Sequence, residues 1–148
     1  MRVQNLKVRV KRLSKDVKMP GYAHAGDAGV DLYATQETSI EPGAIALVPT
    51  GIKIALPEGF EAQVRPKSGL ALNHGLTVLN TPGTIDAGYR GEIGVIIVNH
   101  GKEEFKIEKG KKIAQMVFNK VEKAELEEVD ELDETQRGEG GFGSTGLE

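Results

Sequence analysis

The most regular pattern in the chain is an alternation of apolar and basic residues over Leu6–Lys11, with a period of two. This pattern predicts a strand with one buried face and its basic side chains in solvent. Further runs typical of strands are Ile45–Pro49, Gly51–Leu56, Phe60–Arg65, Leu76–Asn80, Ile93–Asn99, Phe105–Ile107 and Ile113–Asn119. Many short strands in succession predict an all-β sandwich or barrel.

Turn signals rich in glycine and proline separate these runs. They include Glu41-Pro42-Gly43, Pro57-Glu58-Gly59, Thr81-Pro82-Gly83 and Lys109-Gly110. Only Ser68–His74 has the pattern of a short helix, with Ser68 as its predicted N-cap and Gly75 just past its end.

The segment 122–134 carries eight acidic residues and one basic residue. Because Leu126, Val129 and Leu132 recur at a spacing of three, propensity alone predicts an exposed amphipathic helix. Its charge is opposite to that of the first strand. We therefore expect the two segments to lie near each other, within one subunit or between subunits.

Composition narrows the possible functions. A length of 148 residues predicts one domain. The net charge of −3 argues against stable binding to nucleic acid or to an anionic membrane. The chain has no cysteine, which excludes disulfides, thiolate catalysis and cysteine-bound metals. The longest apolar run, Ile93–Val98, is too short to span a membrane, and no signal-like segment is evident, so a cytoplasmic location is expected.

Two polar clusters flanked by glycine contain carboxylates or cations near predicted strand ends. Asp27 and Asp31 could hold a hydrated Mg²⁺, although stabilisation of a turn is the interpretation favoured on these residues alone. The cluster Arg65–Gly69 places two cations and a hydroxyl at a predicted helix start, which suits phosphate oxygens. A solvated strand end is the alternative interpretation.

Two further clusters lie nearer the C-terminus. Asp86 stands between Ile85 and Ala87 in a predicted hairpin, where partial desolvation could tune it as a base; a β-turn aspartate is the simpler interpretation. The tail 137–146 combines an arginine, five glycines and Phe142. It is either a disordered terminus or a lid whose aromatic ring stacks on a planar ligand. A nucleotide is the simplest ligand that would use all four clusters.

Five segments in order resemble the motifs of trimeric deoxyuridine triphosphate nucleotidohydrolases. They are AGDAGVDLYA (25–34), RPKSGLA (65–71), GTIDAGYRGEIGVIIVNH (83–100), GKKIAQMVF (110–118) and RGEGGFGSTG (137–146). The resemblance implies a single domain, 1–148, folded as a jelly-roll-like distorted barrel with one short helix. It also implies a homotrimer with exchanged C-terminal arms, in which 135–148 forms a mobile lid.

The same resemblance implies hydrolysis of dUTP to dUMP and pyrophosphate by Mg²⁺-dependent attack of water on the α-phosphate. Such an activity limits uracil in DNA and supplies dUMP for thymidylate synthesis. Asp86 would be catalytic, and Asp31 would hold Mg²⁺ through water. The substrate-binding residues would be Lys67, Ser68, Gly69, Asn80, Thr84, Ile85, Asp86, Tyr89, Gly94, Gln115, Arg137, Phe142, Gly143, Ser144 and Thr145.

The chain departs from this family at Lys67, where many members have arginine, and charge survives there without the planar fork. The family also uses the stretch corresponding to 122–134 as an extended arm, and we follow the family against the helical propensity. Two other functions compete. A dCTP deaminase of the same fold would have tryptophan in place of Tyr89 and glutamate in place of Ile96. A dUTP-sensing module without catalysis would not need Asp86 and the whole tail.

Overall fold

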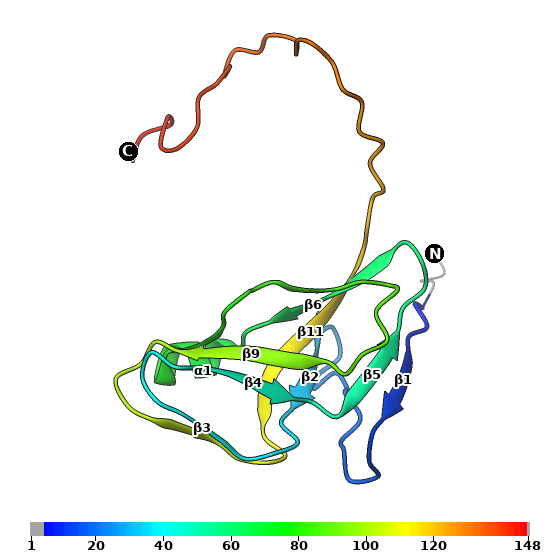
Figure 1. The fold of residues 1–148 in the computed structure, drawn as a ribbon, viewed down its shortest axis with the longest axis vertical. Helices are drawn as coiled ribbons and strands as arrows, with labels where there is room; N and C mark the ends of the chain where they lie inside the picture. The colour runs from blue at the N-terminus through cyan, green and yellow to red at the C-terminus, as the bar shows by residue number, and fades with distance from the viewer. Residues whose placement is uncertain (1–4, 148) are drawn as a thin grey trace.

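The computed structural model describes residues 5–147, and this part of the chain forms an all-β fold with one short helix (Figure 1). The strands are β1 Arg9–Arg12, β2 Gly29–Tyr33, β3 Thr38–Ile40, β4 Ile45–Pro49, β5 Ile52–Ala55, β6 Phe60–Arg65, β7 Leu76–Val78, β8 Gly83–Ile85, β9 Gly94–Asn99, β10 Phe105–Ile107 and β11 Lys112–Lys120, and the helix is α1 Ser68–His74. Within residues 5–147, no helix is long and apolar enough to cross a membrane.

The strands form four antiparallel sheets in which many partners are distant in sequence. The larger two have the orders β2-β11-β6-β8 and β4-β9-β7, and the smaller two pair β1 with β5 and β10 with β3. Connections that run from one sheet to another in this way are typical of jelly-roll barrels rather than of simple meanders. The side chains that face inward from both larger sheets form one core, which includes Leu32, Val64, Val95 and Met116.

The first strand confirms the alternating pattern that predicted it. Val8 and Val10 are half-buried and pack against the core, whereas Lys7, Arg9 and Lys11 are exposed. A one-residue shift would turn the charges inward, so the pattern alone determines which face is buried.

Helix α1 has the predicted bounds, but the prediction that Ser68 is its N-cap is wrong. Lys67 occupies that position, with an extended backbone and no side-chain capping bond. Because the backbone of Lys67 is still extended (φ −97°, ψ 130°), helical geometry begins only at Ser68. At the other end, Gly75 follows the last helical residue, as predicted. It is left-handed (φ 70°), and its N–H donates to the Leu70 and Ala71 carbonyls.

Replacing Gly75 with alanine should lower the free energy of unfolding more than the same change at Gly110. Both glycines have positive φ, 70° and 87°, which costs an alanine about 1–2 kcal/mol. A Cβ at Gly75 would also meet the backbone nitrogen of Gly101 at 2.6 Å, whereas a Cβ at Gly110 meets nothing within 4 Å. Urea unfolding of both variants measures the difference, and equal losses would contradict it.

The segment that follows β11 is extended from Val121 to Glu134 and leaves the barrel as a long arm (Figure 1). The helix favoured by propensity is therefore wrong, and the extended arm implied by the resemblance is confirmed. An isolated helix of this length is marginal in water, and its apolar stripe has no surface of this chain to cover: Leu126 and Leu132 are exposed. Among residues 5–147, no ion pair joins the arm to the basic first strand.

Candidate functional site

Six of the sixteen predicted site residues line two separate pockets. The first, which we call the Asp31 pocket, has a volume of about 400 Å³ and contains Asp31, Lys67, Ser68 and Gln115. The second, the Asp86 pocket, has a volume of about 600 Å³ and contains Thr84 and Asp86. The two pockets share no lining residue.

The Asp31 pocket is centred on a buried carboxylate with two cationic partners. Asp31, on β2, is 5% exposed. Its Oδ1 lies 2.5 Å from Lys67 Nζ and its Oδ2 lies 3.2 Å from Lys112 Nζ. Burial acts to raise the pKa of Asp31, but the hydrogen bonds and charges of Lys67 and Lys112 outweigh it, so this pKa lies below its usual value. The carboxylate is therefore ionised at neutral pH.

Gln115, on β11, connects three of the sequence motifs. It lies opposite Asp31 in the pairing of β11 with β2, and its Nε2 donates to the Pro66 carbonyl at 3.0 Å. A Cβ at Gly29 would meet Gln115 Oε1 at 2.7 Å. Gly29, two residues before Asp31, thus leaves room for the Gln115 side chain beside the segment that leads into α1.

The Asp86 pocket lies beside a tight loop that follows β8. The Asp86 carbonyl accepts a hydrogen bond from the Tyr89 N–H at 3.1 Å. The Arg90 guanidinium donates to the Ala87 and Tyr89 carbonyls at 2.6 and 3.0 Å. These bonds close the loop on itself, so that Asp86 is held at the pocket wall. Ile85, before it, is buried in the core.

Several predicted residues lie outside both pockets. Tyr89 and Gly94 line a separate hollow of about 450 Å³, where the Tyr89 hydroxyl donates to the Glu92 carbonyl at 2.8 Å. Gly69, in the first turn of α1, and Asn80, in the turn before β8, line neither the Asp31 pocket nor the Asp86 pocket.

The predicted lid residues lie at the far end of the arm. Arg137 Nε donates to the Gly140 carbonyl at 2.8 Å. Phe142 is fully exposed and has a positive φ of 47°, and Gly143, Ser144 and Thr145 follow it in a turn. None of these residues lines either pocket of its own chain. The predicted lid extends to residue 148, which lies outside the described residues.

The side-chain oxygens of the Asp31 pocket would suit a Mg²⁺ ion bound mainly by other ligands. Among residues 5–147, no three histidine, aspartate or glutamate side chains gather where they could hold a metal ion. Asp31 offers one carboxylate at a pocket wall. This fits a Mg²⁺ that keeps most of its waters and is held chiefly by a ligand's phosphates, rather than by a protein cage.

Two residues that hold predicted site residues in place were not predicted from the sequence. Lys112 stands within the quoted segment 110–118 and contacts Asp31, and Arg90 stands within 83–100 and closes the Asp86 loop. The signal for Lys112 was present: the two consecutive apolar residues Ile113 and Ala114 break the period of two and indicate a bulge.

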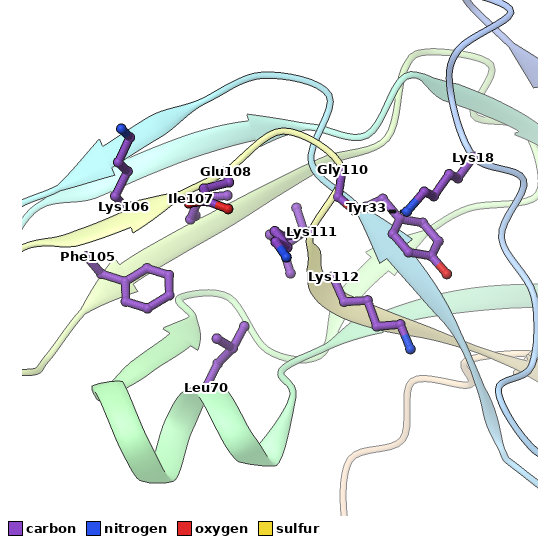
Figure 2. Close-up of a pocket in the computed structure, with 11 residues that line it drawn as sticks. Lys18, Tyr33, Leu70, Phe105, Lys106, Ile107, Glu108, Gly110, Lys111 and Lys112 are labelled. Atoms are coloured by element: carbon purple, nitrogen blue, oxygen red, sulfur yellow. Dashed lines mark hydrogen bonds between the residues drawn. The ribbon is translucent and has the colours of Figure 1, made fainter.

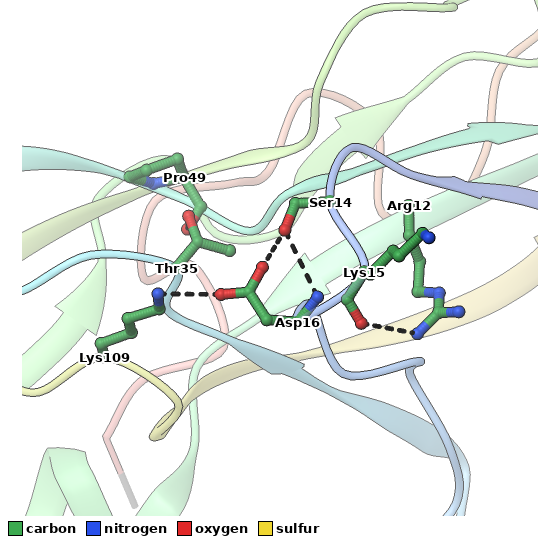
Figure 3. Close-up of polar contacts among 7 residues, drawn as sticks. All are labelled: Arg12, Ser14, Lys15, Asp16, Thr35, Pro49 and Lys109. Carbon is green, nitrogen blue, oxygen red and sulfur yellow. Dashed lines mark hydrogen bonds and ion pairs between the residues drawn. The ribbon is translucent and has the colours of Figure 1, made fainter.

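Two other features contain no predicted site residue. A pocket of about 590 Å³ has Leu70 and Phe105 on its apolar side and includes Lys112 on its rim (Figure 2). A polar cluster joins the loop after β1 to the turn before β11, through the ion pair of Lys109 with Asp16 at 2.9 Å and the hydrogen bond of Ser14 with Asp16 (Figure 3).

Solved structures with the same fold define the class of this protein. The dUTPase of Staphylococcus bacteriophage 80alpha, in complex with dUpNHpp, is 31% identical, with a TM-score of 0.89 over 95% of this chain and 99% of that chain. A variant dUTPase of phage phi11 of S. aureus, described with a structural Mg(II) ion, is 26% identical, with a TM-score of 0.79 over 84% of this chain and 97% of that chain. The chain therefore has the all-β fold of dUTPases.

Sequence comparison identifies the family. The family model for dUTPase matches residues 15–146. Deoxyuridine 5′-triphosphate nucleotidohydrolases of Alkaliphilus metalliredigens and Clostridium tetani are 62% and 61% identical, over 95% and 94% of this chain and 98% and 96% of their own lengths. The chain belongs to the dUTPase family, as its five motifs predicted.

Proposed function

We propose that this protein hydrolyses dUTP to dUMP and pyrophosphate, which limits uracil incorporation into DNA and provides dUMP for thymidylate synthesis. The proposal rests on the two pockets of this dUTPase-family chain, which offer different chemical groups. One pocket offers cations and a fixed carboxylate for a metal-bound triphosphate, and the other offers a single aspartate held by a rigid loop.

In this proposal Asp86 orients a water molecule toward the α-phosphate and accepts its proton as the new P–O bond forms. Lys67, Ser68, Gly69 and Gln115 bind the phosphates, and the charge of Lys67 stabilises the pyrophosphate that leaves. Asp31 would hold Mg²⁺ through water, and the bound ion would supply positive charge that neutralises the phosphates.

The remaining residues would set specificity. Asn80, the backbone of Thr84–Asp86 and Gly94 read the edge of uracil, and Tyr89 packs under the deoxyribose and excludes a ribose 2′-hydroxyl. A site with such fixed polar groups discriminates strongly, because the wrong base would leave them unpaired. Discrimination of this kind needs rigid donors, and the hydrogen bonds of the Asp86 loop supply that rigidity.

We also propose that the active unit is a homotrimer with exchanged arms. The Asp31 pocket, the Asp86 pocket and the lid do not meet within one chain, so a complete site would need parts of neighbouring copies. Within residues 5–147, β1 pairs only with β5, which leaves one edge of a basic strand open to an acidic arm. The single domain 1–148 would end in the lid 135–148.

One experiment tests both statements. Purified protein is given dUTP, dCTP, dTTP or UTP with Mg²⁺, the release of pyrophosphate and ammonia is measured, and the native particle is sized by light scattering. We expect pyrophosphate from dUTP at a rate at least about 100-fold above the others, and a mass of three chains. Ammonia from dCTP would indicate a deaminase instead, and tight dUTP binding without turnover would indicate a sensing module.

A further inference from the structure

Lys112 reaches the Asp31 pocket only because β11 contains a bulge. Lys112 lies opposite Tyr33 and Gln115 opposite Asp31, with a shift of register between Lys112 and Ala114. In a regular strand, positions 112 and 115 would point to opposite faces of the sheet. The extra residue restores them to one face, and both side chains line the Asp31 pocket. Bulges of this kind commonly re-aim a side chain beside a site.

The two lysines that hold Asp31 are attached to the fold differently. Lys67 precedes α1 in an irregular segment and approaches Oδ1, whereas Lys112 lies in the β11 ladder and approaches Oδ2. Each oxygen of the buried carboxylate thus has its own cation. A ligand that attracts Lys67 would remove only one of them.

We propose that Lys112 is a positioning residue that keeps Asp31 in place when Lys67 turns from Asp31 to a nucleotide phosphate. The inference rests on the proposed function, in which Lys67 binds phosphate and Asp31 faces the metal. A carboxylate as buried as Asp31 is unfavourable without a cationic partner. Lys112 supplies that partner in both states, and Oδ1 becomes free to face the metal's hydration shell.

The test compares Lys112→Met, which keeps the length of the side chain and removes its charge, with Lys112→Arg and Lys111→Met. Lys111→Met is the matched control, because it removes the same charge one residue away, and no ion pair joins Lys111 to Asp31 among the described residues. Calorimetry measures the affinity of an α,β-imido analogue of dUTP with Mg²⁺ and with a chelator. The readout is the factor by which Mg²⁺ tightens binding.

We expect Lys112→Met to reduce this factor by about tenfold or more, the usual effect of losing a partner that orients a metal-facing group. Lys112→Arg and Lys111→Met should keep it within about threefold of the wild-type value. An unchanged factor in Lys112→Met would overturn the proposal. So would an equal loss with Mg²⁺ and with chelator, which indicates a merely structural role, or an equal loss in Lys111→Met.

Crystal structures of the ligand-free variants give a second readout that needs no nucleotide. Because Lys67 still pairs with Oδ1 in the ligand-free protein, these variants also carry Lys67→Met. Asp31 should leave its position when Lys112→Met is added and keep it when Lys111→Met is added, and an unmoved Asp31 in both would overturn the proposal. If the wild-type protein did not bind the analogue, the proposed function would fail, and the position of Asp31 would still decide the role of Lys112.

Discussion

Replacing Asp86 with asparagine is expected to lower kcat for dUTP by about 10²- to 10⁴-fold, the usual contribution of a positioned general base. The amide has nearly the same shape as the carboxylate but cannot accept the proton of the attacking water. The loop that holds position 86 is closed through the Asp86 backbone carbonyl and the Arg90 guanidinium. The substitution therefore leaves the loop intact, and nucleotide affinity should stay within a few-fold of wild type.

Single-turnover hydrolysis and calorimetry with the imido analogue separate these two effects. Asp16→Asn is the matched control, since it makes the same chemical change at an exposed carboxyl that pairs with Lys109, outside both the Asp31 and the Asp86 pocket (Figure 3). Full activity in Asp86→Asn would remove Asp86 from the role of base. A loss of affinity as large as the loss of rate would instead make it a binding residue.

Most strands and the helix could be predicted because each depends only on the spacing of apolar residues and on turn residues within a short segment. Strands β4, β6 and β10 and helix α1 have the predicted bounds. Strand β3, Thr38–Ile40, was missed because two of its three residues are polar, so that the segment shows neither an apolar run nor an alternation of apolar and polar residues. The 122–134 segment shows the opposite case: a helical spacing of apolar residues has no effect where the chain offers no surface for them to cover.

The sequence predicts a set of candidate site residues, but it does not predict how they are arranged. Asp31 and Lys67, 36 positions apart, meet because β11 pairs with both β2 and β6, and no local pattern encodes those pairings. The ion pair itself was also not predicted, since Asp31 and Lys67 were assigned to metal and phosphate separately. The division into two pockets follows from the topology of one chain, which the motifs alone do not describe.

Ending the chain after Arg137 is expected to lower kcat/KM for dUTP by about 100-fold or more while leaving the mass of the particle at three chains. The truncation removes Phe142, Ser144 and Thr145, which line neither pocket of their own chain. It keeps the acidic segment 122–134, which we propose holds neighbouring copies together. In the proposed function the lid excludes bulk water and brings the Ser144 and Thr145 hydroxyls to the phosphates, so we expect its loss to affect the reaction rather than the fold. Light scattering and steady-state kinetics measure the two properties, and a monomeric truncated chain would contradict this separation.

Phe142→Trp shows whether the lid closes by stacking. The chain has no tryptophan, so the new indole is the sole tryptophan fluorophore, and it retains an aromatic face. If residue 142 stacks on the nucleotide base, the analogue should quench its fluorescence and kcat should stay within about threefold of wild type. Phe142→Ala should lose about 1–3 kcal/mol of binding free energy, the usual contribution of one stacked base.

Unchanged fluorescence in Phe142→Trp together with unchanged affinity in Phe142→Ala would show that the ring does not cover the base. Phe142 is fully exposed within its own chain, so quenching by the analogue would mean that the tail reaches a bound nucleotide. Trimers that mix intact copies with copies carrying a defective Asp86 pocket would then show which copy supplies the lid.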